Sequence, residues 1–203
     1  MTFKFIDKVG IEIEGGWNVV PPCGPVGSDG SVQVSAPIVG EIRSRPMARY
    51  ETVMDYVRNN WPTATNRTCG FHVHVSLKNE FAYSLLMDKR FYDFFIARIT
   101  AWATAQPIRN QNFWDRLNGL NTYCQKRFSP DIQAERTYKD GIRYAHLNFC
   151  FLQHGTLECR LFPTFKQADT AVKAVTEFLS IVEEWLENAP ESIEVEAVET
   201  VVE

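Results

Sequence analysis

Three short segments of this sequence alternate apolar and polar residues with a period of two, and their polar positions hold mostly carboxylate and imidazole groups. They are residues 9–14 (VGIEIE), 71–76 (FHVHVS) and 156–161 (TLECRL). Successive side chains of a strand point to opposite faces of a sheet, so each segment predicts a strand with one apolar and one polar face. Such a chain is constrained to form a sheet that buries one face and gathers ionisable groups on the other.

Weaker patterns complete the set of predicted elements. Residues 39–44 are a further strand candidate, and residues 147–152 (LNFCFL) are more continuously apolar, which predicts a central strand. A three-residue connection ending at Gly155 predicts a hairpin over 147–161. Apolar residues at helical spacing predict helices over 47–60, 82–104 and 166–187, the last closed by Ala189-Pro190.

Length and apolar content favour a single domain. With 203 residues, of which 45% are hydrophobic, the chain can bury one sizeable core. The order of the elements predicts an α+β fold, in which a curved, mostly antiparallel sheet packs with about three helices. We assign residues 1–189 to this domain. Residues 190–203 are predicted to form an acidic, flexible tail, because the last thirteen residues hold five glutamates and no basic residue.

Charge and cysteine usage narrow the partners and the compartment. The formal net charge is -4, so no basic surplus is available to neutralise phosphate backbones, and nucleic acid is not an expected partner. Charged residues interrupt the apolar runs and the first residues of the chain, so we expect neither a membrane-spanning helix nor a signal peptide. Five irregularly spaced cysteines without a CxxC motif favour reduced thiols in the cytoplasm over a disulfide framework.

The first alternating segment places two carboxylates on one face. Glu12 and Glu14 are two residues apart, which corresponds to about 6.6 Å along a strand, so their carboxylates can flank or share divalent cations. Taken alone, the motif fits a solvent-facing strand equally well, because glutamates are ordinary there.

The second alternating segment adds imidazoles to the same kind of face. His72, His74 and Ser76 alternate with apolar residues, and two of the chain's four histidines lie in this segment. A single strand histidine is more often a hydrogen-bonded structural residue than a ligand. A His-x-His pair is a stronger indication of metal binding, although by itself it also fits zinc or iron sites.

Two further motifs carry charge. Glu158 and Arg160 share the polar face of 156–161, and an arginine beside a carboxylate ligand suits a site that binds both a cation and an anionic phosphate. The alternative is an exposed cross-strand ion pair of little energetic weight. Glu41 lies in GEIRS, and Asp29 precedes it in SDGS, which by itself is a turn signature.

The combined ligand set indicates which cation it would hold. Four glutamates and one histidine are hard, oxygen-rich ligands that suit Mg²⁺ or Mn²⁺ better than a tetrahedral zinc site. Neither a P-loop nor a GxGxxG motif is present, so a nucleotide would have to be bound through metal-held phosphates on a sheet. The predicted metal ligands are Glu12, Glu14, Glu41, His72 and Glu158.

The ordered set GIEIE, SDGS, GEIRS, CGFHVHVS, YC, LN and TLECRLF resembles the amidoligase family. Members of that family are small relatives of glutamine synthetase and glutamate–cysteine ligase. The resemblance covers about residues 9–165, through short motifs separated by unmatched sequence. It implies a sheet of the glutamine synthetase catalytic-domain type and an ATP-dependent ligase, which joins a small-molecule or peptide carboxylate to an amine through an acyl phosphate.

The resemblance also implies roles for individual residues. Glu14 and Glu41 would hold a cation near the acceptor carboxylate, completed by water or by Asp29, because glutamine synthetase has a pair of acids where this sequence has one. A second cation, at the terminal phosphates of ATP, would be held by Glu12, His72 and Glu158. The remaining implied roles are ATP contact for His74 and Ser76, stabilisation of the transferred phosphoryl group for Arg160 and Arg143, and acceptance of the amine's proton for Asp29.

Two other classes of protein remain open from the sequence. One is a mononuclear His/Glu metalloenzyme, a hydrolase or oxygenase using His72, His74 and Glu158 without ATP. The other is a non-catalytic relative that binds metal or nucleotide only. Four more basic residues, which could grip a substrate carboxylate, are predicted to be solvated surface groups: Arg109, Arg116, Lys126 and Arg127. Cys124 is predicted to pack or to line the site rather than to act as a nucleophile.

Overall fold

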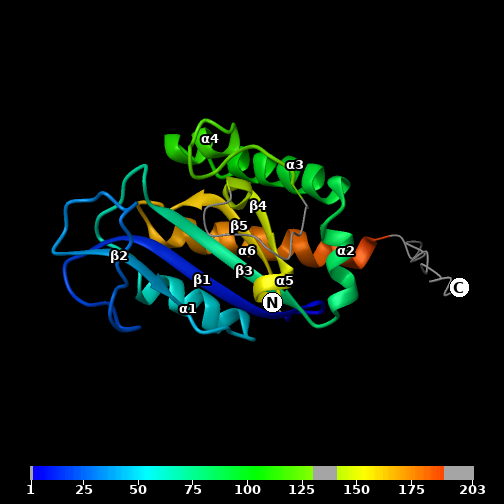
Figure 1. Ribbon diagram of the computed structural model, residues 1–203, viewed down its shortest axis with the longest axis horizontal. Coiled ribbons are helices and arrows are strands. Elements are labelled where there is room, and N and C mark those ends of the chain that lie inside the picture. The colour runs from blue at the N-terminus through cyan, green and yellow to red at the C-terminus, as the bar shows by residue number, and fades with distance from the viewer. Residues whose placement is uncertain (1, 130–140, 190–203) are drawn as a thin grey trace, which may run out of the picture.

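The computed structural model describes residues 2–129 and 141–189, and the predicted acidic tail lies outside these residues. The described chain is an α+β fold built on one five-stranded antiparallel sheet (Figure 1). The strand order is β2-β1-β3-β5-β4. The strands are β1 (Ile6–Trp17), β2 (Ile38–Arg43), β3 (Gly70–Leu77), β4 (Leu147–Cys150) and β5 (Thr156–Pro163).

The three alternating segments and the weaker candidate over 39–44 all form strands, as the sequence predicts. The prediction for 147–152 was wrong in position and length. Residues 147–150 pair with β5 as expected of a hairpin, but β4 is an edge strand, and residues 151–154 form the one-turn helix α5 (Phe151–His154). Most residues of β4 are apolar because side chains from outside the sheet pack over this edge strand. For example, Phe149 packs edge-on against Phe128, with ring centroids 6.0 Å apart. Gly155, at φ 63°, closes α5 before β5 begins.

Six α-helices occur in the described residues, where about three were expected. The long ones are α1 (Tyr50–Asn59), α3 (Lys89–Ala105) and α6 (Ala168–Asn188). The predicted single helix over 82–104 is interrupted after α2 (Tyr83–Leu86), where Asp88 caps α3 by accepting a hydrogen bond from the Arg90 amide. The unexpected helix α4 (Gln111–Leu117) packs against β5. Two 3₁₀ turns cover Glu80–Ala82 and Gly141–Tyr144.

One face of the sheet forms the core. Helix α6 lies behind the sheet with α1 and α3 on either side of it (Figure 1). The inward positions of β1, β3 and β5 join these helices in a single apolar cluster, which includes Ile11, Val73 and Leu157. The alternation that buries this set directs the intervening carboxylates and imidazoles to the opposite face. No helix in the described part of the chain is long and apolar enough to cross a membrane.

Candidate active site and metal centre

Strand register aligns the polar side chains of the open face. In the β1–β2 pair, Glu12 lies opposite Arg43 and Glu14 lies opposite Glu41. In the β1–β3 pair, Glu12 also lies opposite His72. Residues directly opposite each other in an antiparallel pair share a face, with Cβ atoms about 4.5–5.5 Å apart. One row of the sheet therefore reads Arg43, Glu12, His72.

A neighbouring row continues across the other strands. Gly10 lies opposite His74, which lies opposite Glu158 in β5. Glu158 in turn lies opposite Asn148 of the edge strand β4. A register shift between Phe71 and Val73 offsets β5 relative to β3, so that Glu158 comes close to both histidines.

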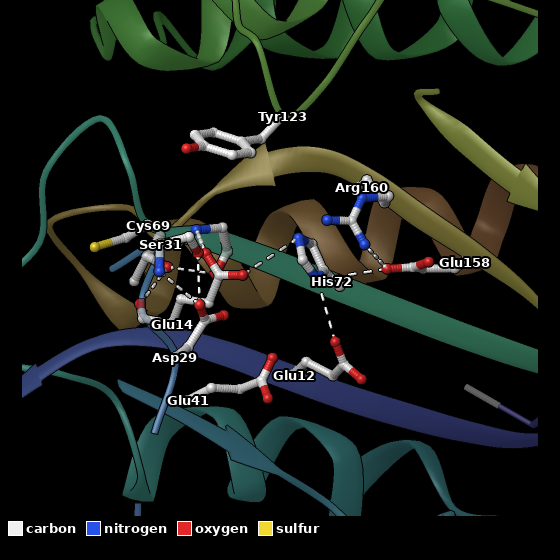
Figure 2. A network of polar contacts seen from close by, with 12 residues as sticks. Glu12, Glu14, Asp29, Ser31, Glu41, Cys69, His72, Tyr123, Glu158 and Arg160 are labelled. Atoms are coloured by element: carbon white, nitrogen blue, oxygen red, sulfur yellow. Dashed lines mark hydrogen bonds and ion pairs between the residues drawn. The ribbon is translucent and has the colours of Figure 1, made fainter. Parts of the chain in front are cut away.

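Within residues 2–129 and 141–189, two groups have the geometry of a cation site, and Glu12, His72 and Glu158 form the first. One ligand atom from each lies within 4.8 Å of the others. The His72 Nδ1 atom is 3.2 Å from Glu12 Oε2 and 3.4 Å from Glu158 Oε1 (Figure 2). The His72 and Glu158 side chains are only 3% and 5% exposed. Buried carboxylates around one imidazole need a cation or protons to offset their charge.

Glu14, Asp29 and Glu41 form the second group, again with one oxygen from each within 4.8 Å. Asp29 reaches the sheet because its loop is fixed to β2: Gly27 and Glu41 exchange backbone hydrogen bonds of 2.8 and 2.9 Å. That contact requires glycine at position 40, where φ is 150° and a Cβ would lie 1.9 Å from the Gly27 carbonyl oxygen. Asp29 Oδ1 also accepts hydrogen bonds from the amide and hydroxyl of Ser31.

Gly70 lies where the two groups meet. Its amide donates a hydrogen bond to Glu14 Oε2. A Cβ at this position would lie 2.6 Å from His72 Nε2 and 3.1 Å from Glu14 Oε2. The glycine that precedes FHVHVS is therefore needed so that a ligand of each group can lie beside the backbone of β3.

Electrostatic conditions differ between the two groups. Burial opposes ionisation of Glu12, but hydrogen bonds from His72 and His74 outweigh it and lower the pKa of Glu12 below its ordinary value. Burial also opposes ionisation of Glu158, yet attraction to Arg160 and the two histidines lowers its pKa. In the second group, burial and then repulsion from Glu12 raise the pKa of Glu41 to about 7.

Arginines border both groups. Arg160 donates to Glu158 Oε1, and its guanidinium is 5.8 Å from the centre of the Tyr144 ring. Arg143 lies over the same ring at 4.8 Å. Arg43 extends from β2 to Glu41 and Glu12. These cations are placed where negative charge could be bound or could develop.

Two cavities open on this face of the sheet. The larger, of about 640 Å³, is lined by His74, Ser76, Asn148 and Glu158 among others. The smaller, of about 380 Å³, contains the whole second group together with His72. Four residues line both cavities and so form a wall that the cavities share: Glu12, Arg43, Arg143 and Arg160. Tyr123 overhangs the smaller cavity above Glu14 (Figure 2).

All the residues predicted for the site lie on this one face. The structure brings the five predicted ligands and Asp29 into the two groups, and Arg160 directly contacts one of them. His74 is 3.5 Å from Glu12 and 3.9 Å from Glu158, so it borders the first group. Ser76 is more distant: it lines the larger cavity, and its hydroxyl lies 3.5 Å from the Lys8 carbonyl oxygen. Arg143 lies between the cavities.

Sequence reasoning misplaced Arg116. It was predicted to be a solvated surface residue, but it is 1% exposed, lines the smaller cavity, and donates to the carbonyl oxygens of Arg160 and Cys69. The cause is helix α4, which was not predicted and which packs against β5. Arg109, Lys126 and Arg127 are exposed, as expected. Cys124 is fully buried, and burial raises the pKa of its thiol to about 11, which fits a packing role.

Asn148 and Arg43 had no predicted role. Asn148 is 5% exposed, and its side-chain amide donates a 2.6 Å hydrogen bond to Glu158 Oε2. The LN motif that contains Asn148 was noticeable in the sequence. Nothing in the neighbouring residues, however, indicated which carboxylate the asparagine side chain would contact. Arg43 is within the GEIRS motif, and its contacts depend on the register of β2 against β1.

No family model matches the sequence. Comparison with curated proteins and with solved structures also found no match. The geometry and chemistry of the site therefore carry the functional argument.

Proposed function

We propose that the protein is an ATP-dependent carboxylate–amine ligase that forms an amide bond. The observation that carries this proposal is the arrangement of two carboxylate-rich groups on one sheet face, at the shared wall of two cavities. A reaction that activates one substrate with another needs two adjoining binding spaces and positive charge between them. The proposal includes the expectation that the sheet is of the glutamine synthetase catalytic-domain type and that the protein acts in the cytoplasm.

The residues present fit divalent cations. Glu12, His72 and Glu158 would hold one ion, and Glu14, Glu41 and Asp29 would hold another. Five carboxylates and one imidazole favour Mg²⁺ or Mn²⁺ over softer metals. Bound there, such ions would neutralise phosphate and carboxylate oxygens.

The larger cavity is suited to ATP. Its volume of about 640 Å³ is within the ordinary range for a small-molecule site. His74 and Ser76 also line it. His74 is 3.5 Å from Glu12, so it would contact the nucleotide near the first cation, whereas Ser76, two residues further along β3, would contact it farther from the terminal phosphate. Arg143 and Arg160 line both cavities, so they would lie beside a phosphoryl group that passed from one cavity to the other.

The smaller cavity is suited to the acceptor carboxylate and the amine. A carboxylate oxygen attacks the terminal phosphorus of ATP, the bond to the bridging oxygen breaks, and ADP leaves. The amine nitrogen then attacks the acyl carbon and phosphate leaves with its bonding electron pair. Asp29 accepts the proton that the nitrogen loses, while Arg160 and Arg143 balance the charge on the transferred group.

The proposal is tested by measuring ADP release with Mg²⁺ across a matrix of carboxylates and amines. For an active pair, Glu158→Gln should remove the metal-dependent activity, because it removes a buried ligand charge of the first group. Glu187→Gln is the matched control: it makes the same charge change at an exposed residue of α6 that pairs with Lys4.

Arg160→Ala should lower turnover by roughly 100-fold or more, as expected for a lost transition-state donor. Arg58→Ala, at an exposed position of α1, should leave turnover unchanged. Metal-dependent chemistry that ignores ATP and survives Arg160→Ala would overturn the ligase proposal in favour of a mononuclear metalloenzyme. ATP and Mg²⁺ binding without amine-dependent ADP release in any pair would favour a non-catalytic relative.

A further inference from the structure

Arg43 contacts one carboxylate from each of the two groups. Its Nη2 atom is 2.7 Å from Glu41 Oε1, and its Nε atom is 3.4 Å from Glu12 Oε1. Glu41 belongs to the second group and Glu12 to the first. A single guanidinium therefore bridges the two sets of oxygens that the proposed function assigns to separate cations.

The sheet register makes this bridge possible. Arg43 is the last residue of the edge strand β2 and lies directly opposite Glu12, while Glu41 precedes it by two positions on the same face. The guanidinium also lines both cavities. It therefore lies at the junction of the two groups.

Arg43 and Arg160 differ in how easily each side chain can move away from the carboxylates that it contacts. The Arg43 side chain is 67% exposed, whereas the Arg160 side chain is 12% exposed and pairs with a nearly buried carboxylate. The carboxylates that it contacts are more enclosed, because the Glu12 and Glu41 side chains are 20% and 12% exposed. The Arg43 side chain can therefore turn into solvent and be hydrated there when another cation takes over the charge of these two carboxylates.

We propose that Arg43 is a displaceable counter-ion that occupies the oxygens of both groups and competes with divalent cations for them. The inference rests on the proposed function only in taking the two groups as cation sites. A divalent ion beside Glu12 or Glu41 repels the guanidinium and takes over the oxygen that it contacts. Arg43 thus stabilises the cation-free state and sets the cation concentration at which the site fills.

The test is a Mn²⁺ titration of the 203-residue protein, followed through the electron paramagnetic resonance signal of free Mn²⁺. Arg43→Gln should bind Mn²⁺ about 3- to 10-fold more tightly than the wild type, because two competing contacts and one repulsive charge are removed. Arg43→Lys, which keeps the charge, should remain closer to the wild type.

Arg45→Gln is the matched control. It removes the same charge at an exposed residue two positions further along, which lines neither of these cavities. If Arg43→Gln bound Mn²⁺ with unchanged or weaker affinity, or if Arg45→Gln tightened binding equally, the counter-ion role would be refuted. A wild-type protein that binds no Mn²⁺ would instead refute the metal assignment beneath both proposals. Circular dichroism would verify that each variant is folded.

Discussion

Replacing Gly70 by alanine tests both groups with a single methyl group. The new Cβ would lie 2.6 Å from His72 Nε2 and 3.1 Å from Glu14 Oε2, where ordinary contact begins at 3.4 Å. The imidazole would have to move by about 0.8 Å, the difference between 3.4 and 2.6 Å, and the carboxylate by a few tenths of an ångström. His72 is 3% exposed and packed between two carboxylates, so the movement cannot be confined to its ring.

The displacement should weaken metal binding more than it lowers stability. Functional groups need placement within about 0.5 Å, and loss of supporting geometry typically reduces metal affinity by about 10- to 100-fold. Overpacking should destabilise the fold by about 1–3 kcal/mol. The reduced freedom of the unfolded chain should offset about 0.4–1 kcal/mol of this. Gly10→Ala is the control, because its Cβ would meet His74 Cβ at an ordinary 3.4 Å.

The assay compares Mn²⁺ titrations and thermal unfolding in EDTA for the wild type, Gly70→Ala and Gly10→Ala. We expect a loss of affinity in Gly70→Ala only, together with a melting temperature lowered by several degrees. If Gly70→Ala bound Mn²⁺ as tightly as Gly10→Ala, then His72 and Glu14 could not both be ligands in the positions found here.

Two further predictions concern the surroundings of the groups. Asn148→Ala should weaken Mn²⁺ binding by about 10- to 100-fold, because it removes one of the hydrogen bonds that orient the Glu158 carboxylate. Cys150→Ala, which removes a thiol that contacts the same amide and lies 3.9 Å from Glu158 Oε2, should have a smaller effect, and equal effects would show that the Asn148 hydrogen bond does not orient this ligand. The second prediction follows from Glu41, whose pKa is raised from 4.5 to about 7. Between pH 4.5 and 7, Glu41 therefore keeps its proton in the metal-free folded protein but has lost it in the unfolded chain. Because the folded state binds more protons in this window, the free energy of unfolding should fall as the pH rises through it. Glu41→Gln should lose less stability over this window in thermal unfolding, and identical profiles would show that Glu41 titrates normally.

The sequence determined the strands and the faces on which their charges lie. In 9–14, 71–76 and 156–161 the period of two is a local property that burial of one face enforces, so the prediction required no knowledge of the partners of each strand. Helix α6 was predictable for the same reason, from apolar residues at helical spacing. The oxygen-rich character of the site also followed from composition and alternation alone.

Tertiary structure decided which charges meet. Asp29 joins Glu14 and Glu41 only because Gly27 pairs with β2. The apolar β4 lies at the edge rather than the centre of the sheet, and its Asn148 meets Glu158 only through the register of that hairpin.

Arg43 illustrates the same limit of local sequence. It bridges the two groups because β2 aligns it with Glu12, and neither residue carries a local signal of that pairing. Strand order and register are set by long-range packing and loop closure, in which residues far apart in sequence compete for the same neighbours. A local pattern can therefore assign a side chain to a face, whereas its partner is decided only when the whole sheet assembles.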